Sequence, residues 1–384
     1  MQASTNGTPT AGDTGTIFVA IELSSQKSWL ITLHSPDQGR MSRHRLEGGD
    51  HAGLLALIAK IGARAAQKLG SEPRVASCYE AGYDGFWLQR LLIAAGINSF
   101  VFDPASIAVE QRARRAKTDR IDGELLLRTL MAYLRGEPRV VRLVRVPTVE
   151  QEDARRVSRE RDRLVTEQTA HTNRIKALLR LSGLAVGTPL RRNWLSWLEQ
   201  QHDWQGQPLP PHVLAEVRRE HARLMLVREQ LAALEQSQQA AQASAVPDAM
   251  AKRREQLQRL KGLGPAFATT LAGELFYKDF RNRREVASYC GLTPSPWKSG
   301  GIDREQGISK AGNPHVRQKT VELAWLWVRH QPNSALSRWF QARTLNAGKR
   351  ARRIAIVALA RKLVVALWRY LDTGLVPEEA LMKA

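Results

Sequence analysis

The sequence is poor in several residue types, and each shortage excludes a class of protein. Only two cysteines, Cys78 and Cys290, occur in 384 residues, too few for a disulfide scaffold or a cysteine-rich zinc site. No apolar run approaches the roughly 20 residues that a membrane-spanning helix needs, which excludes an integral membrane protein. The opening MQASTNGTPTAGDTGT has no basic stretch followed by an apolar one, so we expect no secretory signal. We therefore expect a reducing, cytoplasmic setting.

Acidic residues are scarce relative to basic ones. There are 58 Lys and Arg against 37 Asp and Glu, which gives a net charge of +21 and a pI near 10.6. The hydrophobic share of 43% is ordinary for a folded protein, and the length predicts two or three domains. A basic excess of this size favours a polyanionic partner, most simply nucleic acid.

The first part of the chain predicts an α/β domain over residues 16–147, preceded by a disordered tail at residues 1–15. Short apolar strands come first, as an antiparallel meander, and then alternate with helices, which indicates a partly parallel sheet. The expected strands are Thr16–Glu22, Ser28–Leu33, Met41–Leu46, Arg74–Glu80 and Ile97–Phe102. The expected helices are His51–Leu69, Gly85–Ala95 and Asp119–Leu134.

The remainder is predicted to be mostly helical. Two long charged helices, Gln151–Leu181 and Val213–Gln242, favour an antiparallel coiled-coil arm over residues 148–246. The alternative is a helical bundle packed on the core. The C-terminal domain, residues 247–384, begins with LKGLGPAFATTL and ends with two helices. Gly262 and Gly264 resemble a helix-hairpin-helix turn whose N–H groups hold a phosphate, although an ordinary tight turn explains them equally well.

Four acidic residues of the first domain are candidate metal ligands. Glu22 and Glu80 end predicted strands, while Asp119 and Asp122 lie three apart at a helix start, on one helix face. Carboxylates gathered at strand ends can hold Mg²⁺, and a pair of such ions supports phosphoryl transfer. Alternatively, the glutamates are solvated strand ends and the aspartates cap a helix. A neighbouring basic run suits phosphate entry: Arg112, Arg114, Arg115, Lys117 and Arg120.

A serine in the C-terminal domain is a candidate nucleophile. Ser299 lies between Lys298 and a Gly-Gly pair, on a loop that can expose its hydroxyl. Cations nearby in sequence could stabilise charge on a phosphate under attack: Lys298, Arg304, Lys310 and Arg317. The alternative is a β-turn whose cations are solvated or touch DNA.

With these motifs in view, the chain resembles the DEDD transposases of the insertion-sequence family called one-ten, which are bridge-RNA-guided recombinases. The resemblance rests on three blocks in order. The first comprises VAIELSSQKSW, YEAGYDGFWLQRLL and RRAKTDRIDGELLLRTL, and the second is the long helical arm. The third comprises LKGLGPAFATTLAGEL, YCGLTPSPWKSGG and GISKAGNPHVRQ.

The resemblance implies an RNase H-type, RuvC-like first domain with Glu22, Glu80, Asp119 and Asp122 as its metal-binding tetrad. It implies that Ser299 attacks a DNA phosphate and forms a covalent phosphoserine intermediate. It also implies a site composed of two subunits, a homo-oligomer built as a dimer of dimers, and a structured guide RNA that pairs with donor and target DNA.

One residue departs from the family pattern, which has Asp at the position of Glu22. The extra methylene shifts the carboxylate by about 1.5 Å if the backbone is fixed, and Mg²⁺ is strict about geometry. Two other functions remain open, and Glu22 favours the second of them. One is a junction-resolving endonuclease that uses the tetrad and water, and the other is a non-catalytic nucleic-acid-binding protein.

Overall fold

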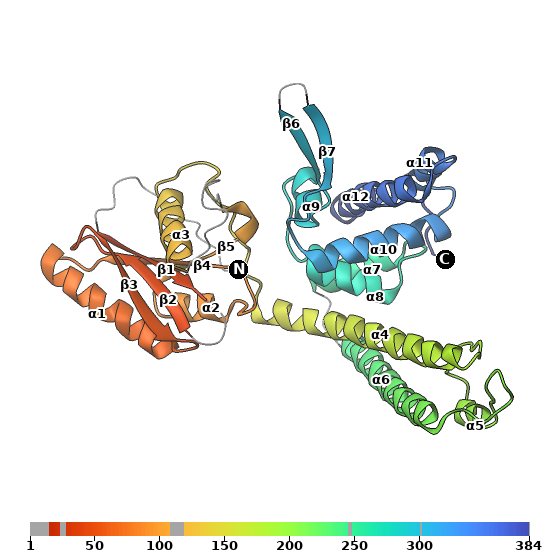
Figure 1. Ribbon diagram of the computed structural model, residues 1–384. Coiled ribbons are helices and arrows are strands. Elements are labelled where there is room, and N and C mark those ends of the chain that lie inside the picture. Colours follow the sequence, from red (N-terminus) through yellow and green to blue (C-terminus); the bar gives the residue numbers. More distant parts are fainter. Residues whose placement is uncertain (1–14, 24–27, 108–118, 245–247, 300–301, 384) are drawn as a thin grey trace. The chain divides into compact units, whose positions relative to one another are not determined.

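The computed structural model describes residues 15–23, 28–107, 119–244, 248–299 and 302–383. Side chains at residues 119–120, 242–244, 296–299 and 302–306 also lie outside the description. The expected disordered tail and four members of the predicted basic run fall outside it: Arg112, Arg114, Arg115 and Lys117. Contacts divide the chain into two compact units, residues 1–147 and 148–384, which are described separately below (Figure 1).

Unit 1 contains a five-stranded mixed sheet in the order β3-β2-β1-β4-β5. Its strands are β1 (Thr16–Glu22), β2 (Ser28–His34), β3 (Met41–Glu47), β4 (Arg74–Glu80) and β5 (Asn98–Phe102). The first three strands pair antiparallel, while β4 is parallel to β1 and β5 is parallel to β4. This confirms the predicted meander followed by a partly parallel sheet, and it is the strand arrangement of an RNase H-like domain.

Helices cover both faces of this sheet, which explains why β1 reads as a nearly continuous apolar run. The helices are α1 (His51–Leu69), α2 (Trp87–Ala94), the short η1 (Pro104–Ser106) and α3 (Asp119–Leu134). Ile17 and Ile21 of β1 pack with Leu54 of α1 on one face. Ala20 and the neighbouring Cys78 pack with Leu126, Leu127 and Leu130 of α3 on the other. The alternation of the strand residues thus builds two cores around one sheet.

Unit 2 begins with a pair of long helices. They are α4 (Val149–Leu181) and α6 (Pro211–Ser244), with α5 (Trp194–Glu199) in the connection. Arg161 pairs with Glu235 at 2.8 Å, and His171 with Glu220 at 2.7 Å. Residue numbers increase along α4 while those of the paired residues on α6 decrease, so the two helices run antiparallel, as predicted. The end of the pair has its own buried cluster, in which Trp194 is a packing residue.

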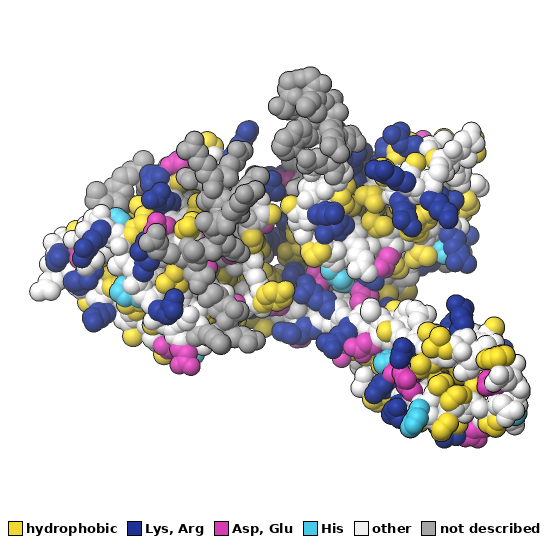
Figure 2. Space-filling model, viewed as in Figure 1, with side chains coloured by type: hydrophobic (Ala, Val, Ile, Leu, Met, Phe, Trp, Pro, Cys, Tyr) yellow, Lys and Arg dark blue, Asp and Glu magenta, His cyan; other side chains and the backbone are white. Residues whose placement is uncertain are grey.

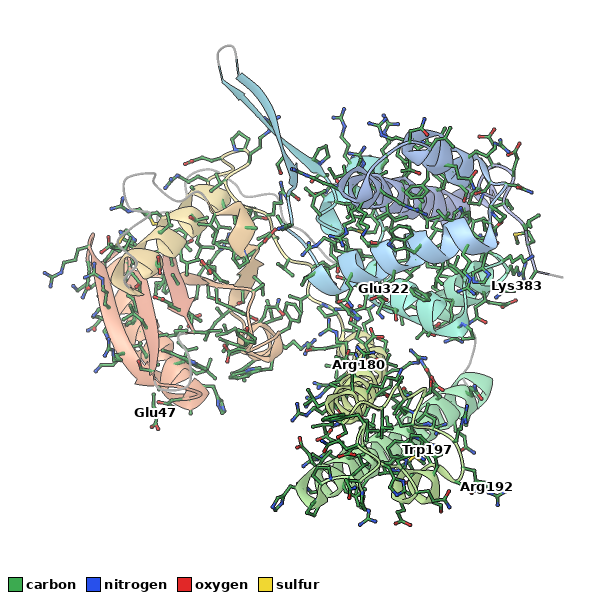
Figure 3. All side chains as sticks on the ribbon, turned by 45° about the vertical axis from the view of Figure 1, so that its right-hand side comes forward. Glu47, Arg180, Arg192, Trp197, Glu322 and Lys383 are labelled. Atoms are coloured by element: carbon green, nitrogen blue, oxygen red, sulfur yellow. The ribbon has the colours of Figure 1, made fainter. Side chains whose placement is uncertain are left out.

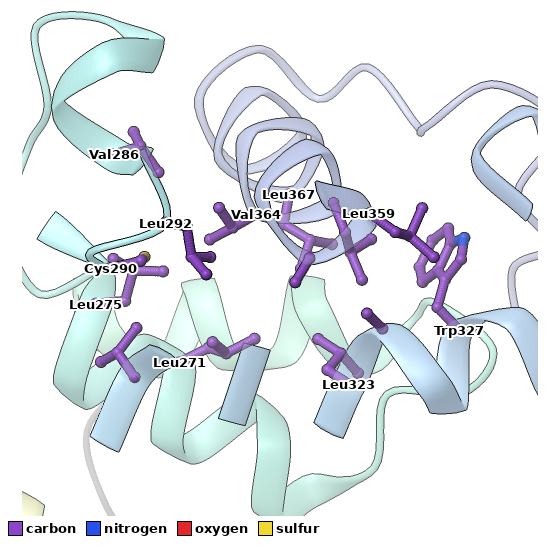
Figure 4. Close-up of a cluster of buried hydrophobic side chains, with 14 of the residues drawn as sticks. Leu271, Leu275, Val286, Cys290, Leu292, Leu323, Trp327, Leu359, Val364 and Leu367 are labelled. Atoms are coloured by element: carbon purple, nitrogen blue, oxygen red, sulfur yellow. The ribbon is translucent and has the colours of Figure 1, made fainter. Parts of the chain in front are cut away.

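The rest of unit 2 is a helical domain that carries a β-ribbon. Its elements are α7 (Ala249–Gln258), α8 (Pro265–Thr270), the π-helical turn η3 (Leu271–Leu275), α9 (Arg283–Tyr289), β6 (Pro294–Ser299), β7 (Ile302–Ile308), α10 (Pro314–His330), α11 (Ala335–Thr344) and α12 (Lys349–Thr373). Their buried side chains form one cluster, in which Leu271, Leu323, Trp327 and Leu359 meet (Figure 4). No helix in the described ranges combines the length and the apolar character that crossing a membrane requires.

Two local features of the helical domain concern the start of α10 and the segment around Ser299. Asn313 is the N-cap residue of α10 and Pro314 is its first residue, and the Asn313 side chain accepts hydrogen bonds from the backbone N–H groups of His315 and Val316. The segment around Ser299 is not an irregular loop. It is an antiparallel ribbon of β6 and β7 that projects from the helices (Figure 1). The helix pair and the helical domain belong to one compact unit.

Candidate functional site

Glu22 and Glu80 are brought together by the sheet. Strands β1 and β4 are parallel neighbours, and their register runs to the pair Ile21 and Tyr79. Each glutamate is the next residue of its strand, so both carboxylates leave adjacent strands at the same edge of the sheet. Glu22 is half-buried and Glu80 is exposed. In open α/β sheets, the carboxyl ends of parallel strands are where ligands bind.

The beginning of α3 lies against the neighbouring strand. A side chain at Gly123 would place a Cβ 2.5 Å from the Thr32 hydroxyl and 3.8 Å from the Leu30 side chain. Glycine therefore allows α3 to approach β2 closely at this point. Leu30 is the pairing partner of Glu22. Asp122, the residue before Gly123, therefore lies on the turn of α3 that approaches Leu30, the partner of Glu22.

The structure tests the donor set of the predicted tetrad only in part, because the side chains of Asp119 and Arg120 lie outside the description. Among the side chains that are described, no group of three or more His, Cys, Asp or Glu residues is placed to hold a metal ion. Two ligand positions, Glu22 and Glu80, are adjacent, and all four predicted ligands offer hard carboxylate oxygens. The chemistry of the donor set therefore fits Mg²⁺.

The cysteine beneath α3 is not a metal ligand. Burial, together with the negative charge of Glu80, raises the pKa of the Cys78 thiol well above its usual value. Its Sγ lies 3.6 Å from the Leu126 carbonyl oxygen, inside the core that α3 forms with the sheet. A neutral thiol in this position contributes to packing, whereas metal binding requires the thiolate.

Ser299 is the last residue of β6 and pairs with Ile302 of β7, so the ribbon fixes the position of its backbone. The side chains of Lys298, Ser299 and Arg304 lie outside the description. Ser299 is therefore placed by its backbone alone, and its hydroxyl is not assigned a contact. A register shift between Pro294 and Pro296 lets β6 accommodate two residues that cannot donate a ladder hydrogen bond.

The base of the ribbon is fixed to the helical domain by tight backbone contacts. Gly312 has a φ of +119°, and a Cβ there would lie 2.4 Å from the Tyr289 carbonyl oxygen. The Arg317 guanidinium donates a hydrogen bond to the Lys310 carbonyl oxygen at 3.0 Å, and Lys310 itself has a φ of 56°. Arg317, predicted to touch nucleic acid, thus has a structural contact at this base.

The predicted helix-hairpin-helix turn connects α7 with α8. Gly262 has a φ of +91°, and a Cβ there would lie 3.0 Å from the His330 Cβ. Gly264 is the N-cap residue of α8. The turn geometry and the close approach are sufficient reasons for a glycine at 262, and phosphate binding by this turn stays a prediction.

A buried carboxylate that the sequence analysis did not single out lies at the centre of unit 2. Glu274 is on the π-helical turn η3, where the Phe276 N–H donates to the Leu271 carbonyl oxygen at 2.8 Å, and its side chain is 0% exposed. The Arg159 guanidinium of α4 approaches both carboxylate oxygens, at 2.5 and 3.0 Å. Burial opposes ionisation, but the contacts with His315 and Arg159 outweigh it and lower the pKa of Glu274 to about 2.

His315 extends this network to a second carboxylate. Its Nε2 lies 2.7 Å from Asp162 Oδ2, and its Nδ1 lies 3.6 Å from Glu274 Oε1. These contacts, with Asp162 first, raise the pKa of His315 to about 9. Lys319 Nζ lies 2.8 Å from the other Asp162 oxygen. The imidazolium therefore bridges two carboxylates, and it joins α4, η3 and α10 below the ribbon.

The contacts of this network join residues that are far apart in the chain, such as Asp162 and His315, which are 153 residues apart, so local spacing did not reveal them. One signal was present in the sequence. Glu274 is the single charged residue in the run Pro265–Tyr277, and a lone acid in an apolar helix is seldom buried without a partner. The partner could not be assigned, because α4 carries many basic residues of similar spacing.

A mixed five-stranded sheet with carboxylates at the ends of parallel strands, followed by a helical unit, is an architecture typical of the class of DEDD transposases. A family model of this class, described as a transposase of IS110 type, matches residues 20–182. A second model, for the transposase IS116/IS110/IS902 family, matches residues 254–339. All four predicted metal ligands fall in the first matched segment, and Ser299 falls in the second.

Curated relatives agree with this assignment. A Sinorhizobium fredii protein named "Putative transposase y4rJ" is 49% identical over 379 residues, covering 97% of this chain and 96% of the relative. The "Transposase for insertion sequence element IS1111A" of Coxiella burnetii is 27% identical over 292 residues, 73% of each chain. The "Probable family 20 transposase" of Pseudomonas aeruginosa is 31% identical and covers 60% of this chain and 67% of that protein. The chain belongs to the IS110 family of transposases, enzymes that bind DNA and cleave and join its strands.

Proposed function

We propose that this transposase cleaves and rejoins DNA through Ser299, with Mg²⁺ held by Glu22, Glu80, Asp119 and Asp122. The observation that carries the proposal is the adjacency of Glu22 and Glu80 at the ends of parallel β1 and β4, in a chain of the IS110 family. A glutamate in place of the family's Asp at position 22 lengthens one ligand by a methylene. The half-buried position of Glu22 supports its role as a ligand in spite of this change.

In the proposed reaction, the Ser299 hydroxyl oxygen attacks a DNA phosphorus. A bond forms between phosphorus and the serine oxygen, and the bond from phosphorus to a deoxyribose oxygen breaks. The serine proton is lost to solvent, and the departing oxygen takes up a proton. Attack by a deoxyribose hydroxyl of another strand then restores the serine and joins the strands. Bound Mg²⁺ would neutralise charge on the phosphate, to which Lys298 and Arg304 of the ribbon would add theirs.

The proposal extends to the assembly and its guide. Carboxylates on unit 1 and a serine on unit 2 suit a site composed of two subunits, within a dimer of dimers. A net charge of +21 per chain suits the combined negative charge of a guide RNA and two DNA duplexes. If base pairing with RNA supplies the sequence choice, the protein reads only backbone and helical shape. Sequencing of RNA that co-purifies with the chain at moderate salt would test this part.

Substitution of the nucleophile tests the chemistry directly. Ser299→Ala is expected to abolish the covalent protein–DNA adduct, measured as a denaturation-resistant band with labelled DNA, because no hydroxyl remains to form the phosphoserine. Ser295→Ala is the matched control, since Ser295 lies on the same strand. It is expected to retain the adduct.

The same assay separates the competing functions. Cleavage by Ser299→Ala without an adduct would indicate water as the nucleophile and a junction-resolving endonuclease. Asp122→Asn is expected to lose cleavage while it keeps DNA binding. If Asp122→Asn cleaved as well as the wild type, the proposed metal ligand would be wrong.

A further inference from the structure

A groove on unit 2 is lined by basic residues that have no role in the proposed reaction. It lies between α9, α12, the start of β6 and the segment Leu375–Glu378, and it encloses about 720 Å³. Five basic side chains line it: Arg283, Arg284, Arg361, Lys362 and Arg369. The lining also contains one acidic residue, Glu378. Figure 2 shows Lys and Arg side chains around hydrophobic surface over α11 and α12.

The positive charge of this groove is not compensated within the described part of the chain. None of the five cations forms an ion pair with a described carboxylate, although other arginines of unit 2 do, such as Arg253 with Asp279 at 2.8 Å. Lys362 Nζ lies 4.8 Å from the centre of the Trp339 ring, a contact that orients a cation without neutralising it. Positive side chains that line one groove repel each other, and a bound anionic ligand lowers this electrostatic repulsion.

The wall of the groove is rigid. Arg361, Val365 and Arg369 are spaced by four residues, so they lie on one face of α12. Leu363 and Leu367 on another face are buried in the main core of the unit. The two arginine positions are therefore about 12 Å apart along a fixed helix axis, at a rise of 1.5 Å per residue. A polyanion with regularly repeated charges suits such a row better than a single small anion does.

The groove adjoins the strand that carries the proposed nucleophile. Thr293 and Pro294 line it, and Pro294 is the first residue of β6, which ends at Ser299. An extended strand rises about 3.4 Å per residue, so these two residues are at most about 17 Å apart. DNA advances about 3.4 Å per base pair, so that span corresponds to about five base pairs. The groove therefore begins within about five base pairs of a DNA phosphate bound at Ser299.

We propose that this groove binds the phosphate backbone of the DNA on which Ser299 acts, within one helical turn of the scissile phosphate. The inference rests on the proposed function of Ser299 for the identity of the ligand, and on the charge and lining of the groove for the site itself. Apolar residues such as Ala287 and Leu336 also line it, and they suit contact with sugars. The contact positions DNA and does not read its sequence.

Binding measurements on the full chain test the site. The triple variant Arg283→Gln, Arg361→Gln, Arg369→Gln is compared with Arg180→Gln, Arg191→Gln, Arg192→Gln, which removes the same charge from exposed positions around the helix pair (Figure 3). The probe is a 20-base-pair duplex of arbitrary sequence, followed by fluorescence anisotropy over a range of salt. The groove variant is expected to bind more weakly and to lower the slope of log K against log salt by about 2.7, at 0.9 per lost phosphate contact.

Each outcome of this comparison decides something. Equal losses in the two triple variants would mean that only total charge matters and would overturn the site, as would an unchanged slope in the groove variant. A loss for a 20-nucleotide single-stranded RNA with none for the duplex would overturn DNA as the ligand. Matching thermal unfolding curves of both variants and the wild type show that neither result comes from misfolding.

A cleavage experiment places the groove relative to the reaction. Lys362→Cys introduces an exposed thiol, and the native Cys78 and Cys290 are both buried, so an iron chelate can be attached selectively. DNA cuts from the chelate are expected within about ten base pairs, one helical turn, of the Ser299 adduct. The matched probe Arg192→Cys is expected to give no such cluster. Clustered cuts in DNA that carries no adduct would support DNA binding in the groove and overturn the proposed role of Ser299. An adduct without clustered cuts would support the role of Ser299 and overturn DNA binding in the groove.

Discussion

His315 keeps its proton well above the pH at which a free histidine loses it. Its folded pKa is about 9, against an ordinary value of 6.5, because Asp162 and Glu274 face it from α4 and η3. Since the folded pKa is the higher one, the stabilisation is complete below about pH 6.5 and is lost as the pH rises through about 9. The pKa of Glu274 is shifted in the opposite direction. Its pKa is lowered from 4.5 to about 2, so its contribution is lost as the pH falls through that range.

This linkage gives a measurable pH profile. The free energy of unfolding of wild type minus that of His315→Gln is expected to fall by up to roughly 3 kcal/mol between about pH 6 and pH 10, since one pKa unit corresponds to 1.36 kcal/mol. Denaturant unfolding at several pH values measures it. The control His202→Gln, at an exposed position beyond α5, is expected to show no such trend. A difference that does not vary with pH would contradict the raised pKa.

At the scale of single elements, the helix pair of α4 and α6 offers a test of packing. Leu224 is fully buried at the end of the pair, while Leu226 on the same helix is 53% exposed. Leu224→Ala is expected to destabilise this part by about 2–5 kcal/mol through lost burial and the cavity that remains. Leu226→Ala is expected to cost less than about 0.5 kcal/mol. Hydrogen exchange of α4 and α6 amides measures both, and equal effects would contradict the assigned packing.

The elements also show which features a sequence can predict. Strands β1 to β5 and helices α1 and α3 follow the predicted ranges closely, because apolar periodicity and caps are local signals. The ribbon of β6 and β7 was not predicted as strands, since Pro294 and Pro296 argue against a strand unless a bulge absorbs them. The Glu274 network was missed for a different reason: its partners are brought together only by tertiary packing. The adjacency of Glu22 and Glu80 followed from the parallel order of β1 and β4.

At the scale of the whole molecule, the division between the two compact units falls between Pro147 and Thr148. The Pro147 carbonyl oxygen accepts a hydrogen bond from Arg90 of unit 1 at 2.8 Å, and Thr148 begins α4 with a capping box. Each side of this peptide bond is therefore satisfied within its own unit. Both units have separate hydrophobic clusters.

Separate production of the two parts tests this division. Residues 1–147 and residues 148–384 are each expected to fold, with cooperative thermal unfolding followed by circular dichroism. A cut at 182, after α4, is the control. It is expected to leave the C-terminal part unstable, because Arg159 and Asp162 would no longer pair with Glu274 and His315. Cooperative unfolding of residues 183–384 as stable as that of 148–384 would contradict the importance of that network.

The continuity of α4 has a mechanical consequence. Its 33 residues form a rod about 50 Å long at 1.5 Å per residue, with no proline to bend it. Its last turns pack with α5 and α6. Arg159 and Asp162, in its N-terminal half, pair with Glu274 and His315. A force applied at α5 would therefore be transmitted along α4 as a torque. That torque would act on the contacts of Glu274 and His315, in the domain that carries β6 and Ser299.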